Sequence, residues 1–181
     1  MGIDNLIVSM KLLKESGHKV HLTIGGQGPE KRALENLVND LRIGADIRFV
    51  GYIASTEMAK YYTGADFFIM PTKRLEGFGL VTTESLACGT PVLGTPVGGT
   101  REILSGLDPD FLFENNTTEA IAKGVREAIE SYYHDERAYR ALRDKCSHFA
   151  QENYSWDRHV STLAEVIDEA ILEGPQESRR I

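Results

Sequence analysis

Short apolar runs alternate with amphipathic segments over the first two-thirds of the chain. Runs rich in β-branched and aromatic residues predict strands, and apolar residues spaced three or four apart predict helices between them. This alternation is typical of repeated βαβ units, which build a parallel sheet with flanking helices. The predicted strands are 19–25, 47–50, 67–70, 91–94 and 111–113, and the predicted helices between them are 6–13, 34–41, 58–62 and 80–88.

After residue 113 the pattern becomes helical only. Three helices are predicted, at 118–133, 135–152 and 156–173, and Ser155 is the expected N-cap of the last one. That helix carries Trp156, Val160 and Leu163 at helical spacing, so one apolar face should pack against a partner. We expect one domain over residues 1–173, followed by a polar tail, 174–181, with frayed structure.

Composition narrows the class of protein. The chain of 181 residues is 41% hydrophobic and 26% charged, as ordinary globular domains are. Its net charge of −7 argues against nucleic-acid binding. The chain has no long apolar run or signal-peptide pattern, which predicts a cytoplasmic location. Two cysteines indicate reduced thiols rather than a disulfide framework, and the five histidines form no pattern of metal ligands.

The most informative stretch is 76–84, where two carboxylates lie eight residues apart around a glycine-broken turn that opens a helix. A helical wheel starting at Leu80 places Glu84 between Leu80 and Val81 on one side and Ala87 and Cys88 on the other. The wheel therefore predicts that the Glu84 carboxylate lies in the apolar face. A charge held there needs hydrogen-bond donors, which a hydroxyl-bearing ligand would supply.

The position of Glu76 also predicts a binding site. The loop 71–78 leaves a predicted strand, and ligands of open parallel sheets bind at the carboxyl ends of strands. Gly77 and Gly79 allow close approach of the backbone, and the N–H groups near Gly79 and Leu80 open a helix, where an anion is favoured. The glycine turns 25–28 and 98–99 are candidates for the same crevice. Each acid taken alone has an ordinary interpretation. Glu76 could be a solvated acid in a loop, and Glu84 a buried carboxylate that a neighbouring backbone group or hydroxyl satisfies by a hydrogen bond.

The run 76–84 resembles the signature of retaining glycosyltransferases with the GT-B fold, in which two Glu enclose a Gly-Phe-Gly. The group includes glycogen synthases, sucrose synthases and bacterial mannosyl- and glucosyltransferases. Further segments follow the pattern, from residue 2 to about 171, and match the carboxyl-terminal, donor-binding half. They are 24–30, 47–52, Tyr61 or Tyr62 with 65–66 and 70–72, 84–92, 97–102 and 155–157. The resemblance implies an α/β fold: a doubly wound, Rossmann-like parallel sheet with flanking helices, a helical carboxyl-terminal region and the family's first strand missing.

The resemblance also implies roles for residues. Glu76 would lie beside the donor sugar and Glu84 would bind the ribose hydroxyls of a nucleotide-diphosphate sugar. Backbone around the glycine turn would meet the sugar and diphosphate, and the residues after the third family strand would hold the base. The residues that would meet the sugar and diphosphate are Gly77, Phe78, Gly79 and Leu80. Those that would hold the base are Gly51 and Tyr52. No cofactor and no metal is expected.

Two parts of the family pattern are absent from this sequence. Met1 stands where the family has a Lys of its diphosphate clamp, and the clamp's Arg and the first strand are missing. Either the sheet closes over the gap, or another segment or chain fills it. Lys73, Arg74 or Arg101 would replace the lost charge, unless all three are ordinary surface cations.

The acceptor-binding amino-terminal half is also missing, and we expect it in the same or a separate chain, with any membrane contact made through that half. Trp156 should then be exposed and could support self-association. The leading hypothesis is the donor-binding half of a retaining hexosyltransferase. The alternative is a non-catalytic nucleotide-binding or scaffold domain of the same fold. A nicotinamide-dependent dehydrogenase is disfavoured, because the glycines at 25–28 lack the Gly-x-Gly-x-x-Gly spacing.

Overall fold

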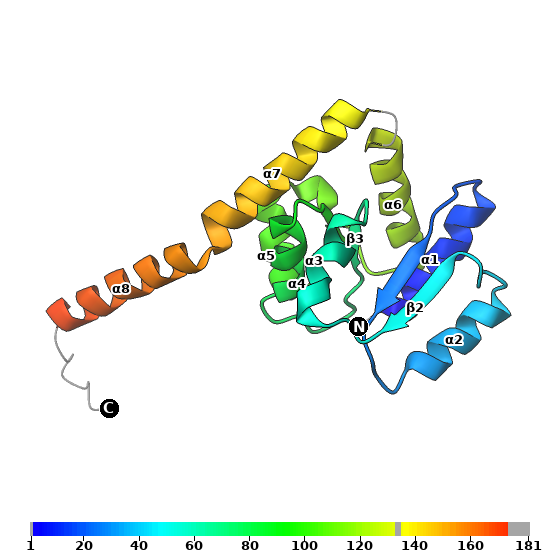
Figure 1. Ribbon diagram of the computed structural model, residues 1–181, viewed down its shortest axis with the longest axis horizontal. Helices are drawn as coiled ribbons and strands as arrows, with labels where there is room; N and C mark the ends of the chain where they lie inside the picture. Colours follow the sequence, from blue (N-terminus) through cyan, green and yellow to red (C-terminus); the bar gives the residue numbers. More distant parts are fainter. Residues whose placement is uncertain (1, 133–134, 174–181) are drawn as a thin grey trace.

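The computed structural model describes residues 2–132 and 135–173 and shows an α/β fold. In Figure 1 helices alternate with short strands up to η1, and helices alone follow. The first part comprises α1 (Ile3–Glu15), β1 (Leu22–Gly25), α2 (Lys31–Asp40), β2 (Ile47–Gly51), α3 (Ser55–Thr63), β3 (Phe68–Met70), α4 (Leu80–Ala87), β4 (Val92–Gly94), α5 (Gly98–Leu107) and η1 (Pro109–Phe111). The second comprises α6 (Thr118–Tyr132), α7 (Glu136–Tyr154) and α8 (Trp156–Glu173).

The sheet is divided into two parallel pairs. β1 pairs with β2 with Leu22 opposite Ile47, and β3 pairs with β4 with Phe68 opposite Val92. Over the described ranges no ladder joins β1 to β3. The expectation of a missing first strand is thus matched by a break in the sheet, and the alternative that the sheet closes over the gap is wrong. Helix α1 packs against both α2, which joins the strands of the first pair, and α6, which follows the second pair.

Three details of the predicted elements are wrong. The strand predicted at 111–113 is reduced to an isolated parallel bridge between Gly94 and Leu112. Its start is a 3₁₀ turn, because Pro109 fixes φ and the Asp108 carboxylate accepts the Asp110 N–H. The first strand begins at residue 22 rather than 19, since its partner begins only at residue 47. Helix α5 was not predicted, because two glycines at its start hide its periodicity.

The remaining predicted boundaries within the described residues lie within three residues of the observed ones. Gly89, with φ of 73°, follows the end of α4 as a C-terminal glycine does. The hydroxyl of Ser155 accepts the Arg158 N–H at the start of α8, which confirms the expected cap. The predicted last residue of α6, Tyr133, lies outside the described residues, as do Met1 and the predicted tail 174–181.

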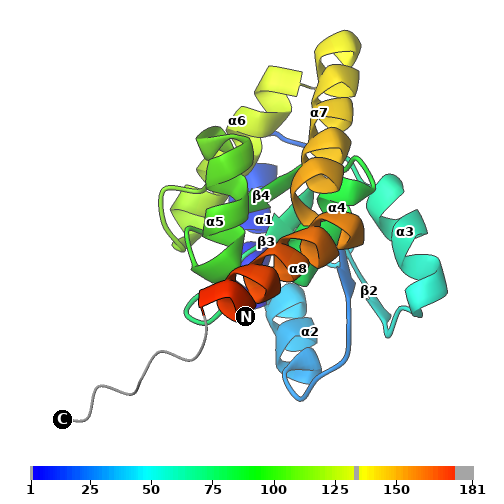
Figure 2. The same ribbon diagram turned by 90° about the vertical axis from the view of Figure 1, so that its left-hand side faces the viewer.

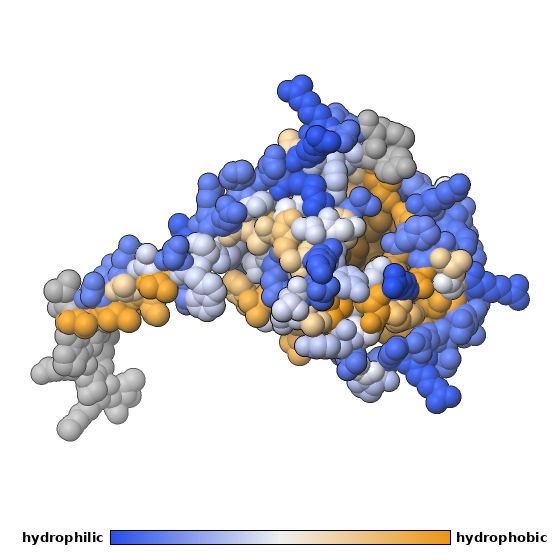
Figure 3. All heavy atoms as spheres, in the orientation of Figure 1, coloured by the Kyte–Doolittle hydropathy of each residue, from blue (hydrophilic) through white to orange (hydrophobic). Residues whose placement is uncertain are grey.

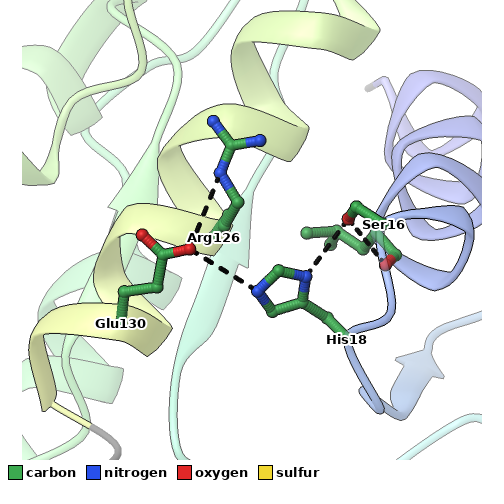
Figure 4. A network of polar contacts seen from close by, with 5 residues as sticks. Ser16, His18, Arg126 and Glu130 are labelled. Atoms are coloured by element: carbon green, nitrogen blue, oxygen red, sulfur yellow. Dashed lines mark hydrogen bonds and ion pairs between the residues drawn. The ribbon is translucent and has the colours of Figure 1, made fainter.

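One hydrophobic core extends through both halves of the fold. Fully buried side chains come from α1, α4, β4, α5 and α6; examples are Ile7, Leu86, Leu93, Leu104 and Ile121. A polar network ties the end of α1 to α6 (Figure 4). His18 contacts the Ser16 hydroxyl at 3.1 Å and the Glu130 carboxylate at 3.7 Å, and Arg126 contacts the same carboxylate. Helix α6, which follows the second strand pair, is thereby fixed beside α1.

Helix α8 projects from the body as an extension beyond α7 (Figures 1 and 2). Its apolar side chains form a stripe that stays exposed, visible along the arm in Figure 3. Trp156 is 81% exposed and Val160 60%. The predicted exposure of this face is confirmed; the other members of the stripe are Leu163, Val166, Ile167 and Ile171.

Candidate functional site

Glu76 is held at the carboxyl end of β3 by two threonines. The Thr72 hydroxyl donates to Glu76 Oε2 at 2.9 Å. The Thr95 hydroxyl, which follows β4, donates to the Thr72 carbonyl at 2.7 Å. Thr72 and Thr95 are both buried, so the half-buried carboxylate is attached to the packed edge of the β3–β4 pair.

The start of α5 is in direct backbone contact with the Glu76 loop. A Cβ at Gly98 would come within 2.2 Å of the Glu76 carbonyl oxygen, and one at Gly99 within 2.1 Å of the Phe78 carbonyl oxygen. The Gly99 N–H also donates to the Gly77 carbonyl at 2.9 Å. Only residues without a side chain allow this approach. The sequence named 98–99 only as a candidate turn, because a glycine pair alone does not reveal what it touches.

The first turn of α4 presents free backbone donors. Gly79 adopts a left-handed conformation, with φ of 82°, and its carbonyl accepts the N–H groups of Thr82 and Thr83. Among the described residues, the N–H groups of Leu80 and Val81 have no acceptor. Phe78 and Leu80 are 54% and 65% exposed, so this helix start opens to solvent. Two donors at the positive end of a helix favour an anion there.

The prediction that Glu84 points into an apolar face is wrong. The buried side of α4 carries Thr82, Ser85 and Leu86, and Glu84 lies on the exposed side, in line with Leu80. The reason is that short hydroxyl side chains find partners inside. Thr82 Oγ1 lies 2.9 Å from the Thr100 hydroxyl, and the Ser85 hydroxyl donates to the Thr90 carbonyl at 3.0 Å. Because these hydroxyls keep their hydrogen bonds inside, Thr82 and Ser85 pack beside Leu86, and Leu80 and Glu84 remain on the exposed side.

Glu84 has a partner that the sequence did not identify. The Tyr62 hydroxyl, from α3, donates to Glu84 Oε2 at 3.0 Å. The Tyr62 ring is buried edge-on against Phe68, with ring centroids 5.4 Å apart. Burial raises the pKa of the Tyr62 phenol well above its usual value, and the bond to Glu84 and its charge raise it further, so the phenol stays a neutral donor. Tyr61 and Tyr62 are adjacent, and no sequence pattern says which faces inward.

Gly51 and Tyr52 lie at the end of the other strand pair. Gly51 has φ of 71°, and its carbonyl accepts the Gly26 N–H at 2.6 Å, which joins the 25–28 turn to the end of β2. Tyr52 is 69% exposed. In the described parts of the chain no hydrogen bond links these residues to 76–84. The structure thus places the two predicted groups of site residues on opposite sides of the break in the sheet.

Of the three candidate cations, Lys73 is engaged by α1. Its ammonium pairs with the Asp4 carboxylate, and its carbonyl accepts the Asn116 amide at 2.9 Å. Partial burial alone would raise the pKa of Asp4, but the hydrogen bond and charge of Lys73 hold that pKa below its usual value. Arg74 and Arg101 are exposed. None of the three is placed in contact with Glu76 or Glu84 by a hydrogen bond in the described ranges.

Comparison with known families identifies the fold and the motif together. The sequence matches the family model of the glycosyl transferases group 1 over residues 1–152. The chain belongs to this family. The match includes the Glu76 loop, both glycine contacts and all of α4, so the resemblance seen in the run 76–84 is confirmed.

Curated relatives and solved structures of this glycosyltransferase family agree. A GDP-mannose-dependent alpha-(1-6)-phosphatidylinositol monomannoside mannosyltransferase of Mycolicibacterium smegmatis is 28% identical over 185 residues, covering 99% of this chain and 46% of its own length. An uncharacterised glycosyltransferase of Methanocaldococcus jannaschii is 31% identical, covering 86% of this chain and 38% of its own. Sucrose-phosphate synthase from Thermosynechococcus elongatus superposes with a TM-score of 0.77 at 25% identity, over 96% of this chain and 43% of that one.

A second solved structure, Anabaena HepE in complex with UDP, superposes with a TM-score of 0.75 at 19% identity, over 91% of this chain and 45% of that one. These likenesses confirm the Rossmann-like α/β domain of a GT-B glycosyltransferase. The chain spans less than half the length of each of these proteins. Within the described residues, no helix is both long and apolar enough to cross a membrane.

Proposed function

We propose that this chain is the donor-binding half of a retaining glycosyltransferase, which transfers a hexose from a nucleotide-diphosphate sugar to an acceptor bound by a second half. One observation carries the proposal. Glu84, the free N–H groups at the start of α4 and the anchored Glu76 loop all adjoin the same short helix. They supply acceptors for hydroxyls and donors for phosphate within one ligand's reach. That the neighbour HepE is described with UDP supports this ligand class.

Each group has a distinct role in the proposed reaction. Glu84 has one oxygen engaged by Tyr62, which leaves the other to accept ribose hydroxyls through charge-assisted hydrogen bonds. The N–H groups of Leu80 and Val81 meet the diphosphate. Because the leaving diphosphate gains negative charge as the sugar bond breaks, these donors stabilise the transition state more than the ground state. The proposal needs no resident metal or cofactor for this step.

Glu76 faces the sugar, where its carboxylate accepts sugar hydroxyls and supports positive charge on the ring as the bond breaks. The backbone of Gly77, Phe78 and Gly79 lets the sugar lie close to the loop. Gly51 and Tyr52 would hold the base from the other side of the break. Exposure of Tyr52 supports this role, since an unpacked aromatic ring offers a stacking surface.

The second half is proposed to bind the acceptor and to cover the exposed stripe of α8. The support is that this chain covers 46% or less of its curated relatives and that Trp156 is 81% exposed. The alternative is that a second copy of this chain covers the same stripe. Sedimentation of the chain alone distinguishes the alternatives, because only self-association gives a dimer without the second half. Action in the cytoplasm, with any membrane contact made by the second half, is part of the same proposal.

Calorimetry with UDP, GDP, ADP and their sugars tests donor binding. Glu84→Gln should weaken nucleotide binding about tenfold, as expected for loss of a charged hydrogen bond, and should reduce the preference for ribose over 2′,3′-dideoxyribose. Glu127→Gln, an exposed acid on α6, is the matched control and should bind as the parent does. No binding by the parent chain would contradict the proposal.

Transfer is tested by adding the acceptor-binding half. Glu76→Gln should bind nucleotide as the parent does but lose transfer, because this acid is assigned to the sugar rather than the nucleotide. The anomeric configuration of the product reports whether the mechanism is retaining. Binding without transfer in the completed protein would favour the alternative of a non-catalytic nucleotide-binding or scaffold domain.

A further inference from the structure

Aromatic rings join the Gly-Phe-Gly loop to the end of α7. The Phe78 ring meets the Tyr154 ring edge-on, with centroids 5.9 Å apart and planes at 75°. The Tyr154 ring meets the Phe149 ring in the same manner, with centroids 5.8 Å apart. Edge-to-face pairs at such distances are favourable contacts. Phe78, Tyr154 and Phe149 therefore form a row, called here the aromatic row, which leads from the candidate site to α7.

One face of α5 runs along the aromatic row. Gly106 approaches one end, since a Cβ there would lie 3.4 Å from the Phe149 ring. Glu102 approaches the middle of the row, because burial raises the pKa of the Tyr154 phenol and the charge of Glu102 raises it further. These two residues of α5 are four apart and so lie one above the other. Gly99, three residues before Glu102, contacts the loop itself at the other end.

Tyr154 attaches the last turn of α7 to the body. Of the residues 151–154, only Tyr154 is not exposed, and it packs against the core. The next residue, Ser155, is extended, with ψ of 151°, and the chain changes direction there (Figure 1). Earlier in α7, the Ser147 hydroxyl donates to the Ala87 carbonyl at the end of α4, at 3.3 Å. The position of Tyr154 is thus set by α7 and α5 rather than by the loop.

The loop is fixed by α5 on both sides of Phe78, but Phe78 itself is 54% exposed. The Gly77 carbonyl accepts the Gly99 N–H at 2.9 Å, and Gly79 is buried. Between these two points the contact with Tyr154 holds the direction of the Phe78 ring. The peptide groups on either side of Phe78 take their orientation from the same contact, because the ring and the backbone share one Cα.

We propose that Tyr154 is a positioning residue for the backbone of residues 77–80, which it holds through the Phe78 ring in the arrangement that a nucleotide-diphosphate sugar meets. The ligand in this inference rests on the proposed function, whereas the contact rests on the aromatic row. Tyr154 acts through Phe78 and not by touching the ligand. It lies beyond residues 1–152, which the family model matches, so that match assigns it no role.

Hydrogen exchange of the protein without ligand, followed by NMR, tests the contact. The Gly99 amide is the reporter, because its acceptor is the Gly77 carbonyl. Tyr154→Leu should speed its exchange about fivefold or more relative to the Thr95 amide, which is bonded to the Met70 carbonyl. Tyr154→Phe keeps the ring and should exchange as the parent does. Unchanged exchange at Gly99 in the folded Leu variant would overturn the proposal.

Tyr139→Leu is the matched control on the same helix. The Tyr139 ring also meets an aromatic ring, that of Phe67 at 6.0 Å, and its hydroxyl donates to the Asp66 carbonyl at 2.6 Å. Its loss should lower the melting temperature, yet Gly99 should exchange as in the parent relative to Thr95. Equal acceleration in the two Leu variants would show that exchange follows general stability, which would also overturn the proposal.

Phe78→Leu removes the other partner of the same contact and keeps the test decisive if Tyr154→Leu does not fold. Because Phe78 is half exposed, this variant should fold and should speed exchange at Gly99 by a similar factor. Where both variants fold, the double variant should add little to either one, as expected for residues that act through one contact. Full additivity of the two effects would contradict a shared contact.

Calorimetry with UDP, GDP and ADP, each compared with its monophosphate, tests the consequence for the site. Tyr154→Leu should lower diphosphate affinity about fivefold more than monophosphate affinity, the size expected for loss of one aromatic contact. The reason is that Glu84, assigned to the ribose, is untouched. An equal change for both classes would overturn the proposal. If the parent binds none of these nucleotides, the proposed function fails, while exchange at Gly99 still decides the role of Tyr154.

Discussion

The two strand pairs differ in how far they are enclosed. All of β4 is buried, with Val92 0% and Leu93 2% exposed, whereas β1 alternates partly buried residues with exposed ones. Both candidate acids adjoin the enclosed pair through Thr72, Thr95 and α4. The predicted base contacts stand on the open pair. The difference indicates that the proposed sugar and phosphate side of the site rests on packed side chains, while the proposed base side stands on a less enclosed strand pair.

The largest expected contrast comes from removing an apolar side chain from each pair. Leu93→Ala should lower the free energy of unfolding by about 2–5 kcal/mol, because a closed core cannot refill the cavity. Ile24→Ala should cost about 1 kcal/mol, since Ile24 is only partly buried. Urea unfolding measures both. Equal losses would contradict the difference in enclosure.

The next largest loss of stability is expected from the contact of Gly99, at the start of α5, with the Glu76 loop beside the enclosed strand pair. Gly99→Ala should cost about 1–3 kcal/mol, because its Cβ would overlap the Phe78 carbonyl oxygen and force the loop away. Gly44→Ala is the control, since it lies outside the candidate site and a Cβ there would meet only the Val38 side chain, at an ordinary contact distance of 3.9 Å. Nucleotide binding, measured with thermal stability, should fall in the first variant and persist in the second. Similar behaviour of the two variants would show that the loop is not fixed by α5.

Tyr62→Phe tests the link between α3 and the open side of α4. The ring keeps its contact with Phe68, and loss of the bond to Glu84 should cost about 0.5–1.5 kcal/mol. The raised pKa of Tyr62 means that the folded protein keeps the phenol proton. The stability that the protonated Tyr62 phenol contributes is therefore fully present below the usual tyrosine pKa of 10.0. It is lost as pH rises toward the pKa that Tyr62 has in the folded protein. Stability should fall less steeply above pH 10 in the variant, and an unchanged alkaline slope would exclude this role.

The smallest effect is expected where α1 meets the Glu76 loop. Asp4→Asn should cost about 0.3–1 kcal/mol, as exposed ion pairs do. Because the pKa of Asp4 is lowered in the folded protein, its ionised carboxylate contributes to stability above the usual pKa of 3.8. This contribution is lost as pH falls below that value. Acid titration of unfolding should be shallower in the variant, and addition of salt should remove the difference at neutral pH. A salt-independent loss would argue for packing rather than charge.

Much of the fold could be predicted because its elements have clear periods. The alternation of strands and helices and the cap at Ser155 follow from local pattern, whereas the exposed face at Trp156 was expected from the resemblance to a family with a second half. The direction of the side chains on the short helix α4 could not be predicted from local pattern. The wheel for α4 assumed that Leu80 and Val81 lie inside, but Thr82 and Ser85 are buried instead because internal partners satisfy their hydroxyls.

The sequence predicted where the candidate site lies, but not which residues contact one another within it. Glu76 and the glycine turn could be placed at a strand end, because parallel strands bring such loops to one edge. Tyr62 and the contact of Gly99 with Phe78 arise between residues distant in sequence, so no local spacing reveals them. The roles of Glu76, Glu84, Gly51 and Tyr52 stay predictions.

The edges of β1 and β3 that face the break have no partner strand among the described residues, and this bears on how copies of this chain meet in concentrated solution. If nothing fills the break, the β1 edge of one molecule can pair with the β3 edge of the next. These surfaces differ, so the contact is head-to-tail and need not close into a ring, which is the geometry that produces filaments. The net charge of −7 opposes such growth by mutual repulsion, and salt that screens this charge removes the barrier.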